Sequence, residues 1–193
     1  TNRFCASGLQ SIMDAARAIM VGDGEIFVAG GIETMSHVPM GGFNPSLNPK
    51  LMKAGMPDAY ISMGLTAENV AEKYKISRAD MDQFAYESHQ KAVKAIQEGK
   101  FKNEIVAIEV PQADGSVKKI DIDEGPRAET TVEKLATLKP VFRENGSVTA
   151  GNPSPLTDGA AAVVVMSAEK AKSLGLKPLA RIHAMAVAGC DPE

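Results

Sequence analysis

The 193-residue sequence has 44% hydrophobic and 23% charged residues, a composition typical of a globular protein with enough apolar residues for a core. Its formal net charge of −3 argues against a surface that binds nucleic acid. The sequence contains no apolar run as long as a membrane span. Its two cysteines do not make a disulfide framework, so we expect a reducing compartment.

The first predicted element is a helix that begins close to Cys5 and ends at Gly22. Apolar residues recur at helical spacing along one expected face: Leu9, Ile12, Met13, Ala16, Ile19 and Met20. The helix dipole and the unpaired N–H groups at a helix N-terminus favour the thiolate, which is the nucleophilic form of cysteine. The residues alone leave open the alternative that Cys5 is an inert, buried cysteine.

The next predicted element is a short buried strand at residues 25–29, which Gly30-Gly31 is expected to end with a turn. A helix followed by a buried strand is typical of a layered α/β core. Residues 36–62 are rich in proline and glycine and lack periodicity. We expect this segment to be a lid or an interaction arm, with a plain surface loop as the alternative.

Two helices are predicted next. Thr66 is expected to cap the first, with its inner face at Ala67, Val70, Ala71 and Tyr74. Ser77 is expected to cap the second in a capping box with Asp80, and Gly99 to end it. Its expected inner face is Met81, Phe84, Ala85, Ser88, Ala92, Ala95 and Ile96. We interpret His89 as a helix-surface or packing residue.

A β-hairpin is predicted around Asp114-Gly115, between alternating residues at 106–110 and 117–122. The acidic residues Asp121, Asp123 and Glu124 that follow lack the spacing of a calcium loop, so we expect no metal site there.

The last part of the sequence begins with a small, polar and glycine-rich loop at residues 149–159, which is a suitable place for a ligand to approach the main chain. We predict a buried strand at 160–166, a helix at 168–174 and another strand at 179–188.

Together these segments resemble the thiolase family, specifically its β-ketoacyl-CoA thiolase (acetyl-CoA acyltransferase) branch. Motifs that carry the resemblance are Asn2-Arg3-Phe4-Cys5-Ala6-Ser7-Gly8-Leu9-Gln10, Val28-Ala29-Gly30-Gly31-Ile32-Glu33-Thr34-Met35-Ser36, Met63-Gly64-Leu65-Thr66-Ala67-Glu68-Asn69-Val70, Asp123-Glu124-Gly125-Pro126-Arg127, Leu138-Lys139-Pro140-Val141-Phe142 and Val148-Thr149-Ala150-Gly151-Asn152, which continues to Asp158-Gly159-Ala160-Ala161. They occur in family order over nearly the whole sequence.

The resemblance implies an α/β fold, namely a thiolase fold with a layered α/β/α core, present only in part and interrupted by an inserted α+β loop domain. We expect residues 1–35 to belong to the N-terminal thiolase domain and 36–158 to form the loop domain with the CoA-binding loop. Residues 159–177 would return to the N-terminal domain, and 178–193 would start the C-terminal domain.

The resemblance also assigns functional residues. It implies that Cys5 is the nucleophile that carries the acyl group as a thioester during thiolytic cleavage of 3-ketoacyl-CoA, in a ping-pong reaction. It places Met63 at the reacting end of the pocket and Arg127 near the nucleotide of CoA. It places Phe142, Ala150 and Ser154 along the pantetheine arm. CoA is then a substrate, and neither a cofactor nor a metal is expected.

The sequence departs from the family pattern before Met63, where biosynthetic thiolases tend to have histidine and this chain has Ser62. This difference favours the degradative, β-oxidation branch, with a biosynthetic acetoacetyl-CoA thiolase as the alternative. A condensing enzyme or a sterol-carrier-type thiolase is a further alternative, which the loop-domain motifs, especially residues 63–70, disfavour.

The family's Gly-His-Pro, Asn-Glu-Ala-Phe and Cys-x-Gly-Gly-Gly motifs do not occur in this sequence, and Cys190 lies in a different context, where we expect it to pack. We therefore expect the chain to be part of a longer enzyme and to be inactive by itself. Its expected partners are acyl-CoA, CoA and other subunits of a homo-oligomer, a dimer or tetramer. A non-catalytic oligomerisation or binding module is the alternative. We expect a bacterial cytoplasmic location, with the mitochondrial or peroxisomal matrix as alternatives.

Overall fold

The computed structural model describes residues 1–192. The chain divides into two compact units. The first comprises Thr1–Ser46 and Leu156–Asp191, and the second comprises Leu47–Pro155 together with Pro192. The first unit is therefore built from two separated parts of the sequence.

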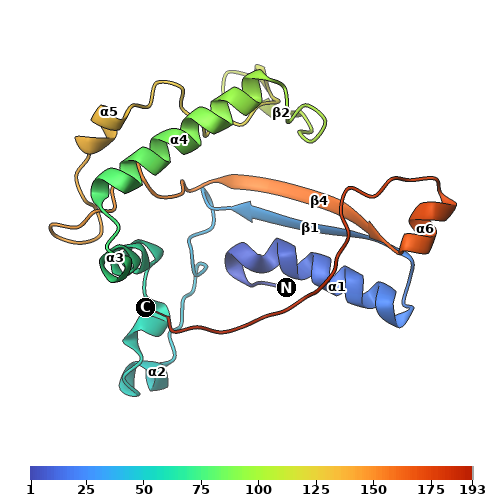
Figure 1. Ribbon diagram of the computed structural model, residues 1–193, viewed down its shortest axis with the longest axis horizontal. Helices are drawn as coiled ribbons and strands as arrows, with labels where there is room; N and C mark the ends of the chain where they lie inside the picture. Colours follow the sequence, from blue (N-terminus) through green and yellow to red (C-terminus); the bar gives the residue numbers. More distant parts are fainter. Residues whose placement is uncertain (193) are drawn as a thin grey trace. The chain divides into compact units, whose positions relative to one another are not determined.

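The first unit is built around helix α1 (Ser7–Val21) and an antiparallel pair of strands, β1 (Ile26–Thr34) and β4 (Asp158–Met166). The helix lies along one face of the pair (Figure 1). It ends as predicted, because Gly22 adopts the left-handed conformation that closes a helix without steric cost. Cys5 lies just before α1, in the 3-10 helix η1 (Phe4–Ala6), and not in the α-helix itself.

The prediction that Gly30-Gly31 ends the first strand is wrong. Strand β1 continues through both glycines to Thr34, and they pair with Ala162 and Ala161 of β4. A Cβ on Gly31 would lie 3.4 Å from Cα of Gly8 in α1. The glycines therefore serve the close approach of helix and strand rather than a turn.

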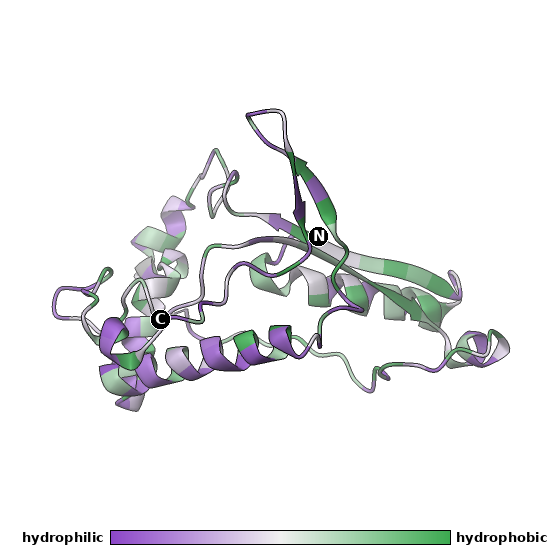
Figure 2. Ribbon diagram, turned by 90° about the horizontal axis from the view of Figure 1, so that it is seen from above, coloured by the Kyte–Doolittle hydropathy of each residue, from purple (hydrophilic) through white to green (hydrophobic). Residues whose placement is uncertain are grey.

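The two strands are apolar along most of their length, as their hydropathy colouring shows (Figure 2). Ala29 is buried, whereas the large side chains of Val28, Ile32 and Val164 are exposed. Residues paired across the strands share a face, so these exposed side chains lie on the face that α1 does not cover. The predicted burial of the 160–166 strand is thus wrong for most of its residues, because within the described chain no element covers that face.

Leu9 and Met20 of α1 are likewise exposed rather than inward, and the helix buries Met13, Ala15 and Ala16.

The C-terminal part of the first unit contains helix α6 (Ala168–Ser173), which confirms the predicted helix. It is capped by Ser167, whose hydroxyl accepts a hydrogen bond from the N–H of Lys170. The predicted strand at 179–188 is wrong, since residues 179–188 form no ladder with another strand. Alternating apolar residues make a strand only where a partner supplies the hydrogen bonds. Cys190 is exposed, so the expectation that it packs is also wrong.

The second unit contains the short helices α2 (Pro49–Lys53) and η2 (Pro57–Tyr60), then α3 (Met63–Tyr74) and α4 (Arg78–Gln97). The α3 cap is Ser62 and not the predicted Thr66, since the Ser62 hydroxyl accepts from the N–H of Leu65. The predicted capping box of Ser77 and Asp80 is confirmed at the start of α4.

The inner face of α4 differs from the predicted one. Asp82 and Ala85 are buried, whereas Phe84 and Ser88 are exposed. The observed inner face of α4 is rotated about the helix axis relative to the predicted one. It includes a buried carboxylate, and the spacing of hydrophobic residues cannot reveal a buried charged residue.

The rest of the second unit is a β-hairpin of β2 (Ile108–Pro111) and β3 (Val117–Ile120), followed by the short helix α5 (Val132–Ala136). The hairpin confirms the prediction around Asp114-Gly115, where Gly115 has a φ of +81°. No helix in the described part of the chain is long and apolar enough to cross a membrane.

Candidate active site

The turn that carries Cys5 has an unusual backbone. Phe4, the residue before it, has a φ of +49°, which is a left-handed conformation that costs a non-glycine residue energy. Hydrogen bonds hold this conformation: Asn2 Oδ1 accepts from the N–H of Phe4 at 2.9 Å, and the Ser7 hydroxyl donates to the Phe4 carbonyl at 2.7 Å. Cys5 itself is exposed at this turn. Strained, held backbone next to a reactive residue type is a common property of functional sites.

A second set of contacts fixes helix α1, and with it this turn, to strand β1. The Ser11 hydroxyl lies 2.8 Å from the Gly8 carbonyl oxygen and 3.0 Å from the Gly30 carbonyl oxygen. With the close approach of Gly31 to Gly8, the first turn of α1 is locked onto the strand. The start of α1, which follows Cys5, is therefore held against β1 by contacts among three glycines and Ser11.

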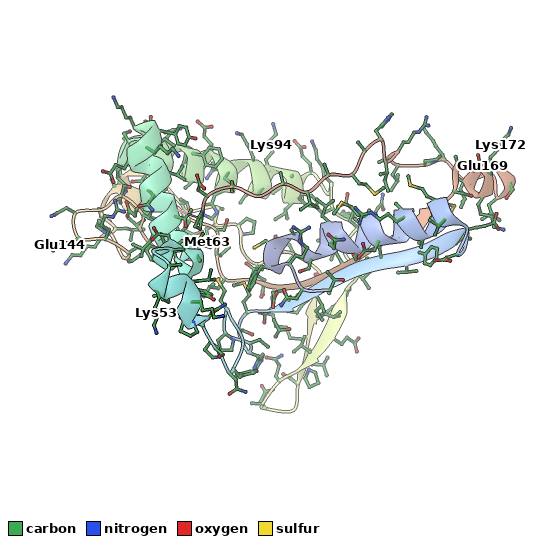
Figure 3. The ribbon with its side chains drawn as sticks, turned by 90° about the horizontal axis from the view of Figure 1, so that it is seen from below. Lys53, Met63, Lys94, Glu144, Glu169 and Lys172 are labelled. Carbon is green, nitrogen blue, oxygen red and sulfur yellow. The ribbon has the colours of Figure 1, made fainter. Side chains whose placement is uncertain are left out.

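In the second unit, the ring of Phe142 lies directly on Gly64, the residue after Met63. A Cβ on Gly64 would overlap the Phe142 ring, so only glycine fits there. Met63 begins α3 (Figure 3) and is 60% exposed, and Phe142 is 43% exposed. The structure thus brings together Phe142 and the start of α3 from opposite ends of this unit's sequence.

Phe142 and the following loop are held by Glu68, a carboxylate on α3 that is only 3% exposed. Its oxygens accept from the N–H of Ser147, the Ser147 hydroxyl and the N–H of Val148, at 2.8–2.9 Å. Burial acts to raise the pKa of Glu68, but these hydrogen bonds and the Arg143 guanidinium together hold it below its ordinary value. Arg143 also donates to Asn69 Oδ1 at 2.6 Å, which ties the neighbour of Phe142 to α3.

The loop at 149–155 is held by a second buried carboxylate, Asp82 of α4, which is 1% exposed. Asp82 accepts from Arg78 at 2.8 Å and from the Asn152 side-chain amide at 3.0 Å. Asn152 Oδ1 in turn accepts from the N–H of the fully buried Thr149. Ala150 and Ser154, on either side of Asn152, are exposed. The loop therefore has a rigid base and an exposed outer side.

Arg127 lies in a turn whose main chain is tied to α4. Its N–H donates to Nδ1 of His89 at 3.1 Å, and the side-chain amide of Gln90 donates to the Ala128 carbonyl at 3.4 Å. Arg127 itself is exposed. His89 is half-buried on α4, in agreement with its interpretation as a helix-surface or packing residue, and its ring nitrogen has in addition a defined hydrogen-bond partner.

These observations separate the predicted site residues into groups. Cys5 belongs to the first unit, and Met63, Arg127, Phe142, Ala150 and Ser154 belong to the second. Within residues 1–192, no group of histidine, cysteine and acidic side chains has the arrangement of a metal site.

Sequence reasoning assigned no supporting role in the site to five residues, namely Phe4, Glu68, Asp82, His89 and Asn152. One signal was available for Asp82, which follows Arg78 by four residues on a helix and so faces it. The partners of Glu68 and His89 lie far away in the sequence and leave no local signal.

Residues 1–169 match the family described as "Thiolase, N-terminal domain". The chain is 54% identical to a 3-ketoacyl-CoA thiolase of Vibrio cholerae over 197 aligned residues, which cover 100% of this chain and 49% of that protein. It is 52% identical to an acetyl-CoA acetyltransferase of Pseudomonas aeruginosa, with 99% of this chain and 51% of that protein covered.

Among solved structures, the dimeric peroxisomal thiolase of Saccharomyces cerevisiae superposes with a TM-score of 0.80 at 41% identity, over 91% of this chain and 45% of that one. The chain spans about half the length of the curated relatives that it matches.

Proposed function

Because this chain belongs to the thiolase family and carries its N-terminal domain, we propose that it supplies the nucleophile and part of the CoA-binding surface of a CoA-dependent acyltransferase. The reaction is the thiolytic cleavage of 3-ketoacyl-CoA by CoA, which yields acetyl-CoA and a shortened acyl-CoA, as in fatty-acid β-oxidation. The V. cholerae relative, a 3-ketoacyl-CoA thiolase, supports this assignment.

In the proposed mechanism, the Cys5 thiolate attacks the 3-keto carbon of the substrate. The bond between C2 and C3 then breaks, its electron pair takes up a proton at C2, and acetyl-CoA leaves. The acyl group remains on Cys5 as a thioester. The thiolate of a second CoA attacks this thioester, and the Cys5 thiolate leaves as the shortened acyl-CoA forms.

The observation that carries the proposal is the turn at Cys5. The left-handed Phe4 and the side chains of Asn2 and Ser7 present an exposed cysteine immediately before a helix. A buried, inert cysteine does not require such a turn, and the exposure of Cys5 argues against that alternative.

The second unit would provide the wall for CoA. We propose that Met63 contacts the reacting end of the substrate, that Phe142, Ala150 and Ser154 line the pantetheine arm, and that Arg127 binds the nucleotide. All five side chains are exposed, and the main chain that carries them is held by hydrogen bonds. Four of the five lie on segments next to the buried carboxylates Glu68 and Asp82. A pre-formed wall lowers the entropic cost of binding a flexible arm.

The finer fold that we propose is a layered α/β/α core with the loop domain inserted at residues 36–158 and the C-terminal domain beginning at 178. The exposed apolar face of β1 and β4 supports a further layer, because apolar sheet faces are normally covered. We propose that the enzyme is a homo-oligomer, a dimer or tetramer, and the dimeric yeast thiolase supports this. Bacterial relatives support a bacterial cytoplasmic location.

A second candidate is a biosynthetic acetoacetyl-CoA thiolase, which the similarity to the P. aeruginosa acetyl-CoA acetyltransferase supports. Ser62, which caps α3 immediately before Met63, favours the degradative reaction because the histidine typical of biosynthetic thiolases is missing there.

The proposal is tested by labelling the two cysteines, which are both exposed, so that exposure alone cannot separate them. We expect bromoacetyl-CoA to alkylate Cys5 well before Cys190, and excess CoA to protect Cys5 alone, as measured by peptide mass spectrometry. Cys5→Ser and Cys190→Ser serve as matched controls. Equal labelling of both cysteines would contradict the proposed role of Cys5.

We also expect the 193-residue chain to release no acetyl-CoA from acetoacetyl-CoA and CoA, because the sequence lacks the Gly-His-Pro and Cys-x-Gly-Gly-Gly motifs. Measurable release would contradict the view that the chain is catalytically incomplete.

A further inference from the structure

We propose that His89 is a positioning residue, which fixes the main chain at Arg127 so that the exposed guanidinium can bind the nucleotide of CoA. This inference rests on the proposed function of Arg127. It concerns a residue outside the motifs that identify the family, and it rests on one hydrogen bond and on the geometry of the turn around it.

The turn that carries Arg127, residues 127–130, is not itself part of a strand or a helix. It closes on itself through the N–H of Thr130, which donates to the Arg127 carbonyl at 3.3 Å. Towards the C-terminal end of the turn, the Lys134 ammonium donates to the Glu129 carbonyl at 3.0 Å. Within residues 1–192, the hydrogen bonds that hold the start of this turn, at Arg127 and Ala128, come from α4.

At that side the His89 ring nitrogen Nδ1 lies 3.1 Å from the Arg127 main-chain nitrogen. A main-chain N–H can only donate, so Nδ1 must accept, and the proton of the neutral ring is on Nε2. The adjacent Gln90 reaches the Ala128 carbonyl over a longer distance of 3.4 Å. Two neighbouring side chains of α4 therefore hold two neighbouring peptide groups, and the His89 bond is the shorter.

The chemistry of Arg127 explains why this tether matters. A guanidinium recognises phosphate through two parallel hydrogen bonds, which requires a defined direction of approach. The Arg127 side chain makes no hydrogen bond within residues 1–192 that would orient it, so its direction depends on its main chain. A side chain that fixes the Arg127 N–H limits the directions from which the guanidinium can reach a ligand.

The experiment measures binding of CoA and of pantetheine, which lacks the nucleotide, to the 193-residue chain by isothermal titration calorimetry. We expect His89→Leu to weaken CoA binding about threefold to tenfold, the effect of one lost neutral hydrogen bond, and to leave pantetheine binding unchanged. His89→Asn should restore CoA binding, because its Oδ1 can accept at the same place. Ser88→Ala, at the exposed neighbouring position of α4, is the matched control.

A double-mutant cycle with Arg127→Ala separates positioning from a general structural role. If His89 acts through Arg127, His89→Leu should have no further effect on CoA binding once Arg127 is alanine. Additive losses would overturn the positioning role, as would full CoA affinity in His89→Leu. If the wild-type chain and Arg127→Ala bind CoA equally well, the nucleotide contact of Arg127 in the proposed function fails instead.

Discussion

The two units of the chain hold their functional residues by different means. In the first unit, Cys5 is positioned by a strained turn and by close packing of α1 on the glycines of β1. In the second unit, the loops that carry Phe142 and Ala150 are held by the buried carboxylates Glu68 and Asp82. The first arrangement depends on small residues and backbone geometry, and the second depends on buried charge.

This difference has consequences for stability. Buried carboxylates whose hydrogen bonds come from segments far away in the sequence act as cross-links, and removing one leaves its partners unsatisfied. The first unit relies on close packing of glycines instead. A substitution elsewhere in α1 that disturbs this packing leaves no buried polar group without a hydrogen-bond partner. We therefore expect the removal of a single polar side chain to lower the free energy of unfolding strongly in the second unit and only slightly in the first.

The tyrosines allow the two units to be followed separately. All three, Tyr60, Tyr74 and Tyr86, lie in the second unit, and the sequence contains no tryptophan to mask their emission. Tyrosine fluorescence during urea unfolding thus reports on the second unit, while circular dichroism reports on both.

The largest effect should come from Asp82→Ala. The substitution leaves Arg78 and the Asn152 amide without their buried acceptor, so we expect the free energy of unfolding of the second unit to fall by about 3–5 kcal/mol. Asp14→Ala is the matched control in the first unit, because it removes an exposed ion pair with Arg17, worth at most about 1 kcal/mol. Equal losses in the two variants would refute the contrast between the units.

Glu68→Gln should cost about 3 kcal/mol at neutral pH, because an amide cannot accept from all the groups that Glu68 binds. The pKa of Glu68 is lower in the folded chain than its ordinary value of 4.5, so ionised Glu68 stabilises the fold above that value. This stabilisation is lost as the pH falls through the folded pKa.

The stability difference between wild type and Glu68→Gln should therefore shrink below about pH 4.5 in urea titrations followed by tyrosine fluorescence. Glu72→Gln, which affects an exposed partner of Arg143 on the same helix, should show little change at any pH. A difference that is constant from neutral to acid pH would mean that the charge of Glu68 is not what stabilises the loop.

The smallest effects should come from one substitution made in both units, and they should have opposite signs. Gly64→Ala pushes a methyl group into the Phe142 ring, so we expect a loss of about 1–3 kcal/mol. Gly8→Ala meets no neighbouring atom and should stabilise α1 by about 0.5–1 kcal/mol. Urea unfolding checks both, and a stabilising Gly64→Ala would show that Phe142 is not held against α3.

Local signals predicted much of the secondary structure. The end of α1 at Gly22, the capping box at Ser77 and the hairpin at Asp114-Gly115 were all readable, because each depends on residues that are neighbours in the sequence. The signals failed where the outcome depended on a distant partner. Gly30-Gly31 continues a strand that α1 approaches closely, and residues 179–188 form no strand because no strand within residues 1–192 pairs with them.

The sequence by itself determined the family and the candidate residues, since the motifs around Cys5, Met63 and Arg127 are contiguous and depend on residue identity alone. Only the tertiary structure decided how those residues are held. Phe4 has a left-handed conformation, the ring of Phe142 lies on Gly64, and His89 accepts a hydrogen bond from the N–H of Arg127. The last two contacts join residues that are far apart in the sequence. Such features depend on how whole helices and strands pack together. The hydropathy and the spacing of residues along the chain do not reveal this packing.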